Sequence, residues 1–474
     1  MKIKSSITLL AMSTFLCTSA HALTVIGENQ QKDLNVTIYN ANIALVNDTR
    51  TTNLTSGKNH ISYESIADMI IPESALLSGG SVVTTEQNFN YDLIDTNSLL
   101  AKSVGENVIL ETVNQNTGEK QQTEAKLIAY NNNQPILEIN GKIVTNPQGT
   151  ILLNNLPKGL ISKPSLNMNI NSPSNQETDL TLSYLTRGLS WTANYVANLN
   201  EDENSMGLNG FITLNNQSSS TFKNADLKLV AGDVAQVRHV RRSMMKAMAV
   251  DAMQVNSFDE AMPTVEDVAD FYVYTLPSKT TVLPKQEKQV ALLSKTNVAV
   301  QKDYVFDNAL KPYNANPLEN IKARVVYQFD NNKGNTLGIA LPKGVIRFYK
   351  NTKDNESVYV GEAFINHTPN KATVKLPMGE AFDIFANAKL TKQNQIGDTQ
   401  FKTYEIIFKN GSTKDKTVTV YENFNGDWQI TQTSMDYIKE TANRVKWRFN
   451  VPANQETTLT YQVAVENKHS HRKY

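Results

Sequence analysis

The chain has 474 residues, with 46 Lys and Arg against 46 Asp and Glu, so its formal net charge is zero. This balance excludes a whole-protein attraction to nucleic acid or to an anionic membrane, and neither is an expected partner. The length is large for one core and predicts two to four domains.

Residues 1–22 have the pattern of a secretory signal peptide. Lys2 and Lys4 precede an apolar run, and Ala20-His21-Ala22 supplies the small residues that a signal peptidase requires before its cleavage point. The mature chain is therefore expected to begin at Leu23 and to be exported to the periplasm, with outer-membrane association or secretion as the alternatives.

Cleavage would also remove Cys17, the one cysteine of the chain. The mature protein would then have no disulfide and no thiol chemistry, and its stability would come from packing. Phe15 and Leu16 stand where a lipobox needs small residues, which argues against lipidation of Cys17. No other apolar run approaches the roughly 20 residues that span a bilayer, so no transmembrane segment is predicted in the mature chain.

Two different strand patterns follow the signal peptide. Residues 23–100 alternate apolar and polar positions over longer strands, with a turn at Asn40-Ala41-Asn42, and are predicted to form an antiparallel meander. Residues 101–160 contain five very short apolar runs at close spacing, with Asn140-Gly141 as a two-residue hairpin turn. We interpret this second segment as a small β-barrel module.

Residues 161–300 return to longer strands and contain the seam between two halves of the chain. From Tyr184 to Tyr195, apolar and aromatic positions alternate with polar ones on both sides of Gly188, which predicts two core strands meeting at that glycine. Residues 237–270 lack this pattern. They run from a basic start through a group of methionines to an acidic end, and we interpret them as a flexible insertion.

Residues 301–468 contain strands at the spacing of β-sandwich domains, and residues 469–474 form a basic tail. No stretch has the pattern of a long amphipathic helix. The sequence therefore predicts an all-β protein: an antiparallel meander, a small β-barrel module and one or two β-sandwich domains, with few short helices.

An ordered series of segments between about Gln176 and Val465 carries a family resemblance. The segments are Tyr184 to Tyr195, Ala225 to Val234, Leu341 to Tyr349, Gly361-Glu362, His367-Thr368-Pro369 and Gly379 to Ile384. Together they resemble the DUF4139 family of bacterial envelope proteins, some of which are called mucoidy-inhibitor-like. The resemblance implies an exported β-rich protein with a variable insertion, often rich in Ala and Met. It supplies no reaction and no set of catalytic residues.

Few residues of the mature chain suggest chemistry. His367, five residues after Glu362, could be half of an acid–base or metal pair, but a turn histidine held near Pro369 explains the same pattern. Asp383 and Asp233 follow strands and could form the carboxylate pair of a glycoside hydrolase, although an Asp in this position more often caps a turn. The common nucleotide, zinc and serine-hydrolase motifs are absent, so no catalytic residue, cofactor or metal is predicted.

Two features suggest contact with a partner. Arg187 lies inside the aromatic strand pair and could clamp an anionic ligand or stack on a neighbouring ring. The methionines of the insertion, Met244, Met245, Met248 and Met253, are compatible with a connector, a partner-binding face or a copper(I) site, in that order.

We therefore predict an exported, non-catalytic protein that binds an envelope protein or polysaccharide. The alternative is a carboxylate-dependent hydrolase of envelope glycans or peptides. An enzyme should bring Glu362, His367 or Asp383 together with a second carboxylate in a concave site. A binding protein should instead show an exposed apolar patch.

Overall fold

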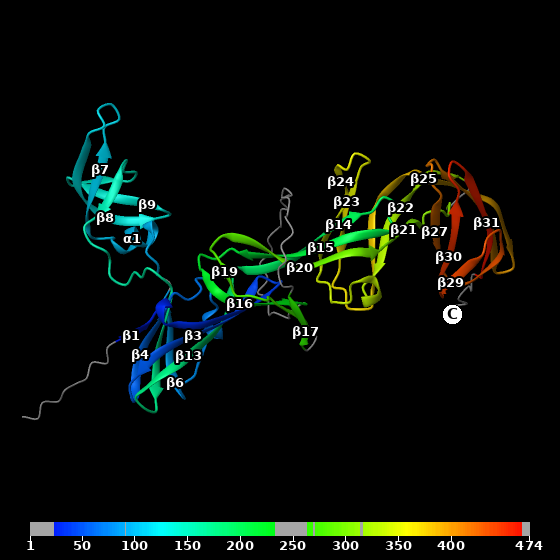
Figure 1. The fold of residues 1–474 in the computed structure, drawn as a ribbon. Helices are drawn as coiled ribbons and strands as arrows, with labels where there is room; N and C mark the ends of the chain where they lie inside the picture. Colours follow the sequence, from blue (N-terminus) through cyan, green and yellow to red (C-terminus); the bar gives the residue numbers. More distant parts are fainter. Residues whose placement is uncertain (1–22, 91, 233–262, 269–270, 313–315, 467–474) are drawn as a thin grey trace, which may run out of the picture.

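A computed structural model describes residues 23–90, 92–232, 263–268, 271–312 and 316–466 (Figure 1). Strands dominate this part of the chain, which confirms the all-β fold class. The predicted signal peptide and the tail from residue 469 lie outside the described residues. Short 3₁₀ turns interrupt the strands at Glu28–Gln30, Pro72–Ser74 and Lys333–Asn335.

Two sheets form the N-terminal part of the molecule. One has the order β1 (Leu23–Ile26), β4 (Gly57–Glu64), β12 (Ser165–Ser172) and β6 (Val83–Asn90). The other has the order β17 (Thr264–Val268), β18 (Phe271–Thr275), β16 (Phe222–Ala231), β2 (Gln31–Tyr39), β3 (Ile43–Leu54), β13 (Gln176–Arg187) and β5 (Leu76–Ser78), with β19 (Thr280–Val282) paired to β16. Their buried faces belong to one hydrophobic core.

Strand β17 corrects the predicted extent of the flexible insertion. Residues 264–268 fall inside the predicted 237–270 segment, yet they pair antiparallel with Phe271–Thr275 of β18. The backbone of β18 provides the hydrogen-bond partners, so strand pairing does not need the hydrophobic alternation that β17 lacks in sequence. The part of the insertion between 233 and 262 lies outside the described residues.

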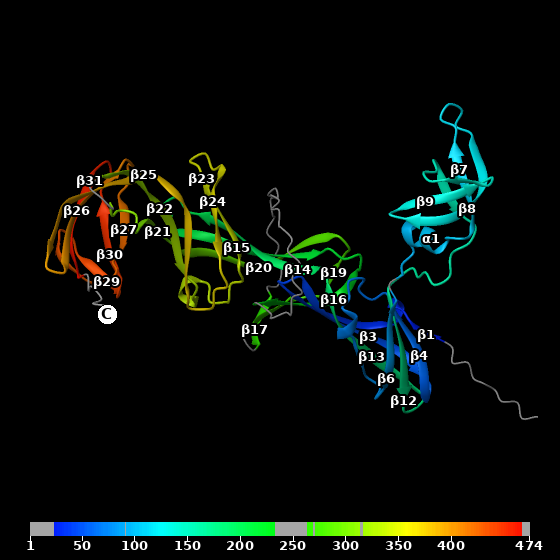
Figure 2. The ribbon, with the colours of Figure 1, turned by 180° about the vertical axis from the view of Figure 1, so that it is seen from behind.

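Residues 96–153 form a separate unit in the sequence and in space (Figures 1 and 2). Helix α1 (Thr96–Lys102) is followed by an antiparallel sheet with the order β10 (Lys142–Val144), β9 (Gln134–Ile139), β8 (Lys120–Asn131), β7 (Asn107–Val113) and β11 (Thr150–Leu153). This unit has its own core around Leu127 and Leu137. It is inserted between β6 and β12, which pair with each other in the N-terminal sheet.

Gly188 is the point where the chain leaves one sheet for another. Strand β13 ends at Arg187, and β14 (Leu189–Leu199) begins a five-stranded sheet with the order β20 (Gln286–Ala299), β15 (Ser205–Asn216), β14, β23 (Gly344–Asn351) and β24 (Ser357–Ile365). Gly188 has φ +86°, and a Cβ there would approach Met69 Sδ to 2.8 Å. The prediction of two strands meeting at this glycine is confirmed.

The C-terminal sheet has nine strands. Its order is β28 (Asp427–Thr433), β31 (Glu456–Glu466), β26 (Thr399–Asn410), β25 (Thr373–Ile396), β22 (Leu318–Asp330), β21 (Gln301–Asp307), β27 (Lys416–Asn423), β30 (Arg444–Val451) and β29 (Tyr437–Thr441). It encloses a second large core that is rich in aromatic rings, including Trp447 and Tyr461.

Strands β22 and β25 contribute to both large cores. Tyr327 and Leu376 lie in the first core, whereas Ala323 and Ile384 lie in the second. Between these points β25 bulges, because Lys322 is opposite Phe385 while Arg324, two residues later, is opposite Glu380. We call this bulge, residues 381–384, the corner of the molecule.

Candidate functional site

The structure does not assemble the catalytic candidates of the sequence into one site. Glu362 forms an ion pair with Arg347 at 3.2 Å. His367 accepts a hydrogen bond at Nδ1 from the backbone N–H of Lys343 at 3.3 Å. Asp383 lies on the corner bulge. Among the described residues, no three His, Cys, Asp or Glu side chains gather as metal ligands would.

The partner-binding candidates lie apart from these residues or outside the described part of the chain. Arg187 is the last residue of β13; its backbone N–H donates to the Met69 carbonyl at 3.0 Å, and its side chain is exposed. Trp191 is instead buried against Tyr274, with ring centroids 5.9 Å apart. Asp233, Met244, Met245, Met248 and Met253 lie outside the described residues.

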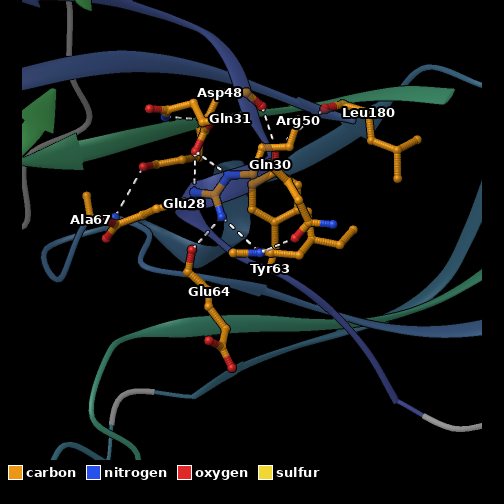
Figure 3. A network of polar contacts seen from close by, with 12 residues as sticks. Glu28, Gln30, Gln31, Asp48, Arg50, Tyr63, Glu64, Ala67 and Leu180 are labelled. Atoms are coloured by element: carbon orange, nitrogen blue, oxygen red, sulfur yellow. Dashed lines mark hydrogen bonds and ion pairs between the residues drawn. The ribbon is translucent and has the colours of Figure 1, made fainter. Parts of the chain in front are cut away.

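A buried ionic network in the N-terminal unit is the first polar cluster that the structure adds (Figure 3). Arg50 is 1% exposed and donates from Nε and Nη2 to Asp48 Oδ2, at 3.1 and 2.6 Å. Its Nη1 donates to the carbonyls of Ile26 and Glu64, and its guanidinium lies 4.3 Å from the centroid of the Tyr63 ring.

This network joins β3 of one N-terminal sheet to β1 and β4 of the other. Four donor contacts already occupy the guanidinium of Arg50, which has five N–H groups. A buried charge is tolerated only when it is paired and hydrogen-bonded in this way. We therefore assign the network a role in holding the two sheets together.

The corner carries the most unusual surface of the described chain. Phe382, in the bulge of β25, is 90% exposed. Val358, Tyr359, Val360 and Phe364 of β24 are each about half exposed. Val360 and Phe382 line the same hollow of about 330 Å³. We call these five residues the apolar patch.

Four of the five residues of the apolar patch lie on the edge strand β24, and Phe382 lies on β25. Strand β24 is the last strand of its sheet and pairs only with β23. Natural sheet edges are usually protected by charges, proline or short length. The opposite edge strand of the same sheet, β20, follows this rule with Glu287, Lys288 and Lys295, but β24 presents apolar side chains instead.

A second ionic cluster lies next to the hollow, which Lys302 and Tyr327 help to line. Glu203, in the turn between β14 and β15, forms ion pairs with Lys302 at 2.5 Å and Lys350 at 2.7 Å. The hydroxyl of Tyr327 donates to Glu203 Oε2 at 3.1 Å. Burial alone would raise the pKa of Glu203, but the bonds from Lys302 and Lys350 outweigh it and lower that pKa to about 2.

A larger groove of about 850 Å³ lies on the other side of the corner. Its walls come from β21, β22, β25, β27, β29 and β30, and most of its lining is polar or charged. The sequence did not single out any of its residues. Side chains two residues apart on a strand point to the same face. The charged residues Lys322 and Arg324 therefore mark the outer face of their predicted strand, and this signal could have found the groove.

No protein-family model matches the chain, and no curated protein matches its sequence. Within the residues that the structure describes, no helix combines the length and the apolar character that crossing a membrane requires.

Proposed function

We propose that this chain is an exported, non-catalytic binding protein of the bacterial cell envelope, and that a partner protein docks on the apolar patch. The observation that carries the proposal is Phe382, a large aromatic side chain that is 90% exposed on a strand bulge. Exposed apolar clusters of this kind mark interaction surfaces, and aromatic side chains supply most binding hot spots.

The surroundings of Phe382 support a protein partner. The hollow beside it is lined by Val360 and Met378 as well as by charged groups, as in interfaces with an apolar centre and a polar rim. Strand β24 has a ladder partner on one side only, so its other side offers backbone groups to another polypeptide where β25 does not pack against it. Lys302 and Tyr327, which line the hollow, are both bonded to Glu203, and side chains held in this way lose less entropy when a partner docks.

Export is supported by the sequence of residues 1–22 and by the resemblance to DUF4139 envelope proteins. For the hydrolase alternative, Glu362 and His367 have separate surroundings, and Asp383 shares its hollow with one other carboxylate, Glu380. The exposed Phe382 in the same hollow is the reason that we favour docking over hydrolysis. Fractionation of cells producing the chain with and without residues 1–22 tests the compartment. We expect the chain in the periplasmic fraction only when those residues are present.

Docking can be tested by photo-crosslinking in intact cells, with a photoreactive residue at position 359 and mass spectrometry of the products. Phe382→Asp should abolish the specific product and leave the melting temperature nearly unchanged, because this side chain packs on little. Ile396→Asp is the matched control, since Ile396 is also an exposed apolar residue of β25. Equal products from wild type and Phe382→Asp would contradict the proposal.

A further inference from the structure

The 850 Å³ groove is built on the face of the C-terminal sheet that points away from the aromatic core. Along β22, Lys322 and Arg324 line the groove, whereas Ala323 between them is buried in the core. Along β27, Thr419 and Tyr421 line it, whereas Val420 is buried. Because the lining residues come from paired strands, the groove is preformed and rigid.

The carboxylates on the acidic side of the groove are all paired with arginines of the protein. Asp303 pairs with Arg448 at 3.0 Å. Asp307 and Glu440 both pair with Arg444, at 3.1 and 3.2 Å. Three carboxylates against two guanidiniums leave one negative charge on this side, and the carboxylate oxygens can still accept further hydrogen bonds.

The basic side of the groove is not neutralised. Lys322, Arg324 and Lys375 have no ion-pair partner among the residues that the structure describes. Glu380, opposite Arg324 in the strand register, is the acidic residue on this side and also has no ion pair there. Three cations against one carboxylate leave two positive charges on this side, more than the one negative charge left on the acidic side, which favours an anionic ligand along the basic side.

The spacing of the cations indicates an extended ligand. Lys322 and Arg324 are two residues apart on one strand face, and Lys375 is opposite Gln328 on the neighbouring strand. At about 3.3 Å per residue, the three cations span roughly 20 Å along β22. A single small anion cannot contact all of them, but a linear polymer with repeated negative charges can.

The floor of the groove indicates a ligand that also forms hydrogen bonds. Thr419 lines the groove and is only 2% exposed, yet its Oγ1 has no hydrogen-bond partner in the described chain. Buried hydroxyls are normally hydrogen-bonded, so a ligand group that reaches this one would supply a missing hydrogen bond. One face of the nearby Tyr421 ring is covered by the Arg444 guanidinium, 4.1 Å from its centroid.

We propose that this groove binds a linear anionic glycan whose sugar units carry carboxylates. Its carboxylates contact Lys322, Arg324 and Lys375, and its hydroxyls donate to the acidic side and bond with Thr419. A polyanion without hydroxyls meets only acceptors on the acidic side. This site is separate from the apolar patch, so it stands or fails independently of the proposed partner docking.

The test is calorimetric titration of the purified chain with polygalacturonate, a linear carboxylated glycan. We expect binding that weakens as salt concentration rises, much weaker binding of galacturonate monomer, and no binding of neutral dextran. The triple variant Lys322→Gln, Arg324→Gln, Lys375→Gln should bind at least about tenfold more weakly, since three charge contacts are lost together. Lys126→Gln, Lys142→Gln, Lys353→Gln changes the net charge equally at exposed sites elsewhere and should bind as wild type.

Thr419→Val separates recognition from charge. It should keep the melting temperature of wild type and lower the affinity a few-fold, whereas Thr419→Ser should retain the affinity. Three results would overturn the proposal: no binding of polygalacturonate, equal loss in the two triple variants, or equally tight binding of poly-L-glutamate. The last result would show a general polyanion surface with no preference for sugars.

Discussion

Replacing Glu422 by Gln should stabilise the C-terminal unit at pH 8. Glu422, near the end of β27, is 0% exposed. Its Oε1 accepts from the Leu310 backbone N–H at 3.3 Å, and its Oε2 lies 3.4 Å from Lys311 Nζ. Burial raises the pKa of Glu422 to about 7, because the ion pair with Lys311 offsets only part of the cost of removing the charge from water.

The sign and size of the effect follow from the difference between the folded and unfolded pKa. The unfolded value is 4.5, so between pH 4.5 and about 7 the folded chain binds more protons than the unfolded chain. Stability therefore falls as pH rises through this window, by roughly 3 kcal/mol at 1.36 kcal/mol per unit of pKa shift. Glutamine resembles the protonated acid and keeps the acceptor for Leu310. Glu422→Gln should thus match wild type near pH 4.5 and exceed it by up to about 3 kcal/mol at pH 8.

Urea unfolding followed by tryptophan fluorescence measures this effect, in a Trp191→Phe background. The remaining two tryptophans, Trp428 and Trp447, both belong to the C-terminal core, so the signal reports that unit. The reasoning is refuted if the urea midpoint of wild type, compared with that of the variant, does not decrease as the pH is raised from 5 to 8. It is equally refuted if Glu422→Gln is less stable than wild type at pH 8.

Three other substitutions test the packing and the second ionic cluster. Glu203→Gln removes a carboxylate whose pKa is lowered to about 2. The stabilisation from this carboxylate is present above pH 4.5 and is lost as the pH falls toward 2. In unfolding experiments across this pH range, the variant should be less stable than wild type by roughly 1–2 kcal/mol at pH 7 and equally stable near pH 2. Trp191→Ala should cost about 3–5 kcal/mol in chemical unfolding, since this ring is 1% exposed; loss of binding without loss of stability would move Trp191 to a surface role. Gly344→Ala should lower the melting temperature sharply, because the added Cβ would lie 2.0 Å from the Ala193 carbonyl oxygen; an unchanged melting temperature would show that β23 can shift away from β14.

The alternation of apolar and polar residues predicted the strands well, and it also indicates which charged residues are buried. Glu422 has the same parity as Val418 and Val420, both buried, so the alternation already placed it on the inner face. In the same way, Asp48 and Arg50 share the inner face of β3 with Val46. A charged residue at an inward-facing strand position indicates a buried ionic group. The positions of Glu422 and of the Asp48–Arg50 pair could therefore have been predicted from the alternation along their strands.

The sequence could not show which strands pair. Residues 344–365 follow β22 in the chain but return to the sheet of β14, because β14 and β23 pair in parallel. Helix α1 was also missed, although Asp95 accepts from the N–H groups of Asn97 and Ser98 as an N-cap does. Such pairings depend on contacts between distant segments, which local periodicity does not report.

The corner shows the same limit for the candidate site. Alternation indicates two strands with a break near Gly379, but the structure has one continuous strand, β25, with a bulge. The bulge turns Phe382 outward while Ala381 and Ile384 stay buried. An aromatic residue in a strand is normally assigned to a core, so its exposure can be seen only once the register with β22 is known.

Strands β22 and β25 both run from one large core into the next, so two continuous strands connect the packed units at the corner. The two units are linked at this place by the backbones of β22 and β25 and by the hydrogen bonds between these strands. Two ligands bound on opposite sides of this junction would therefore be connected through strands and not through a flexible linker.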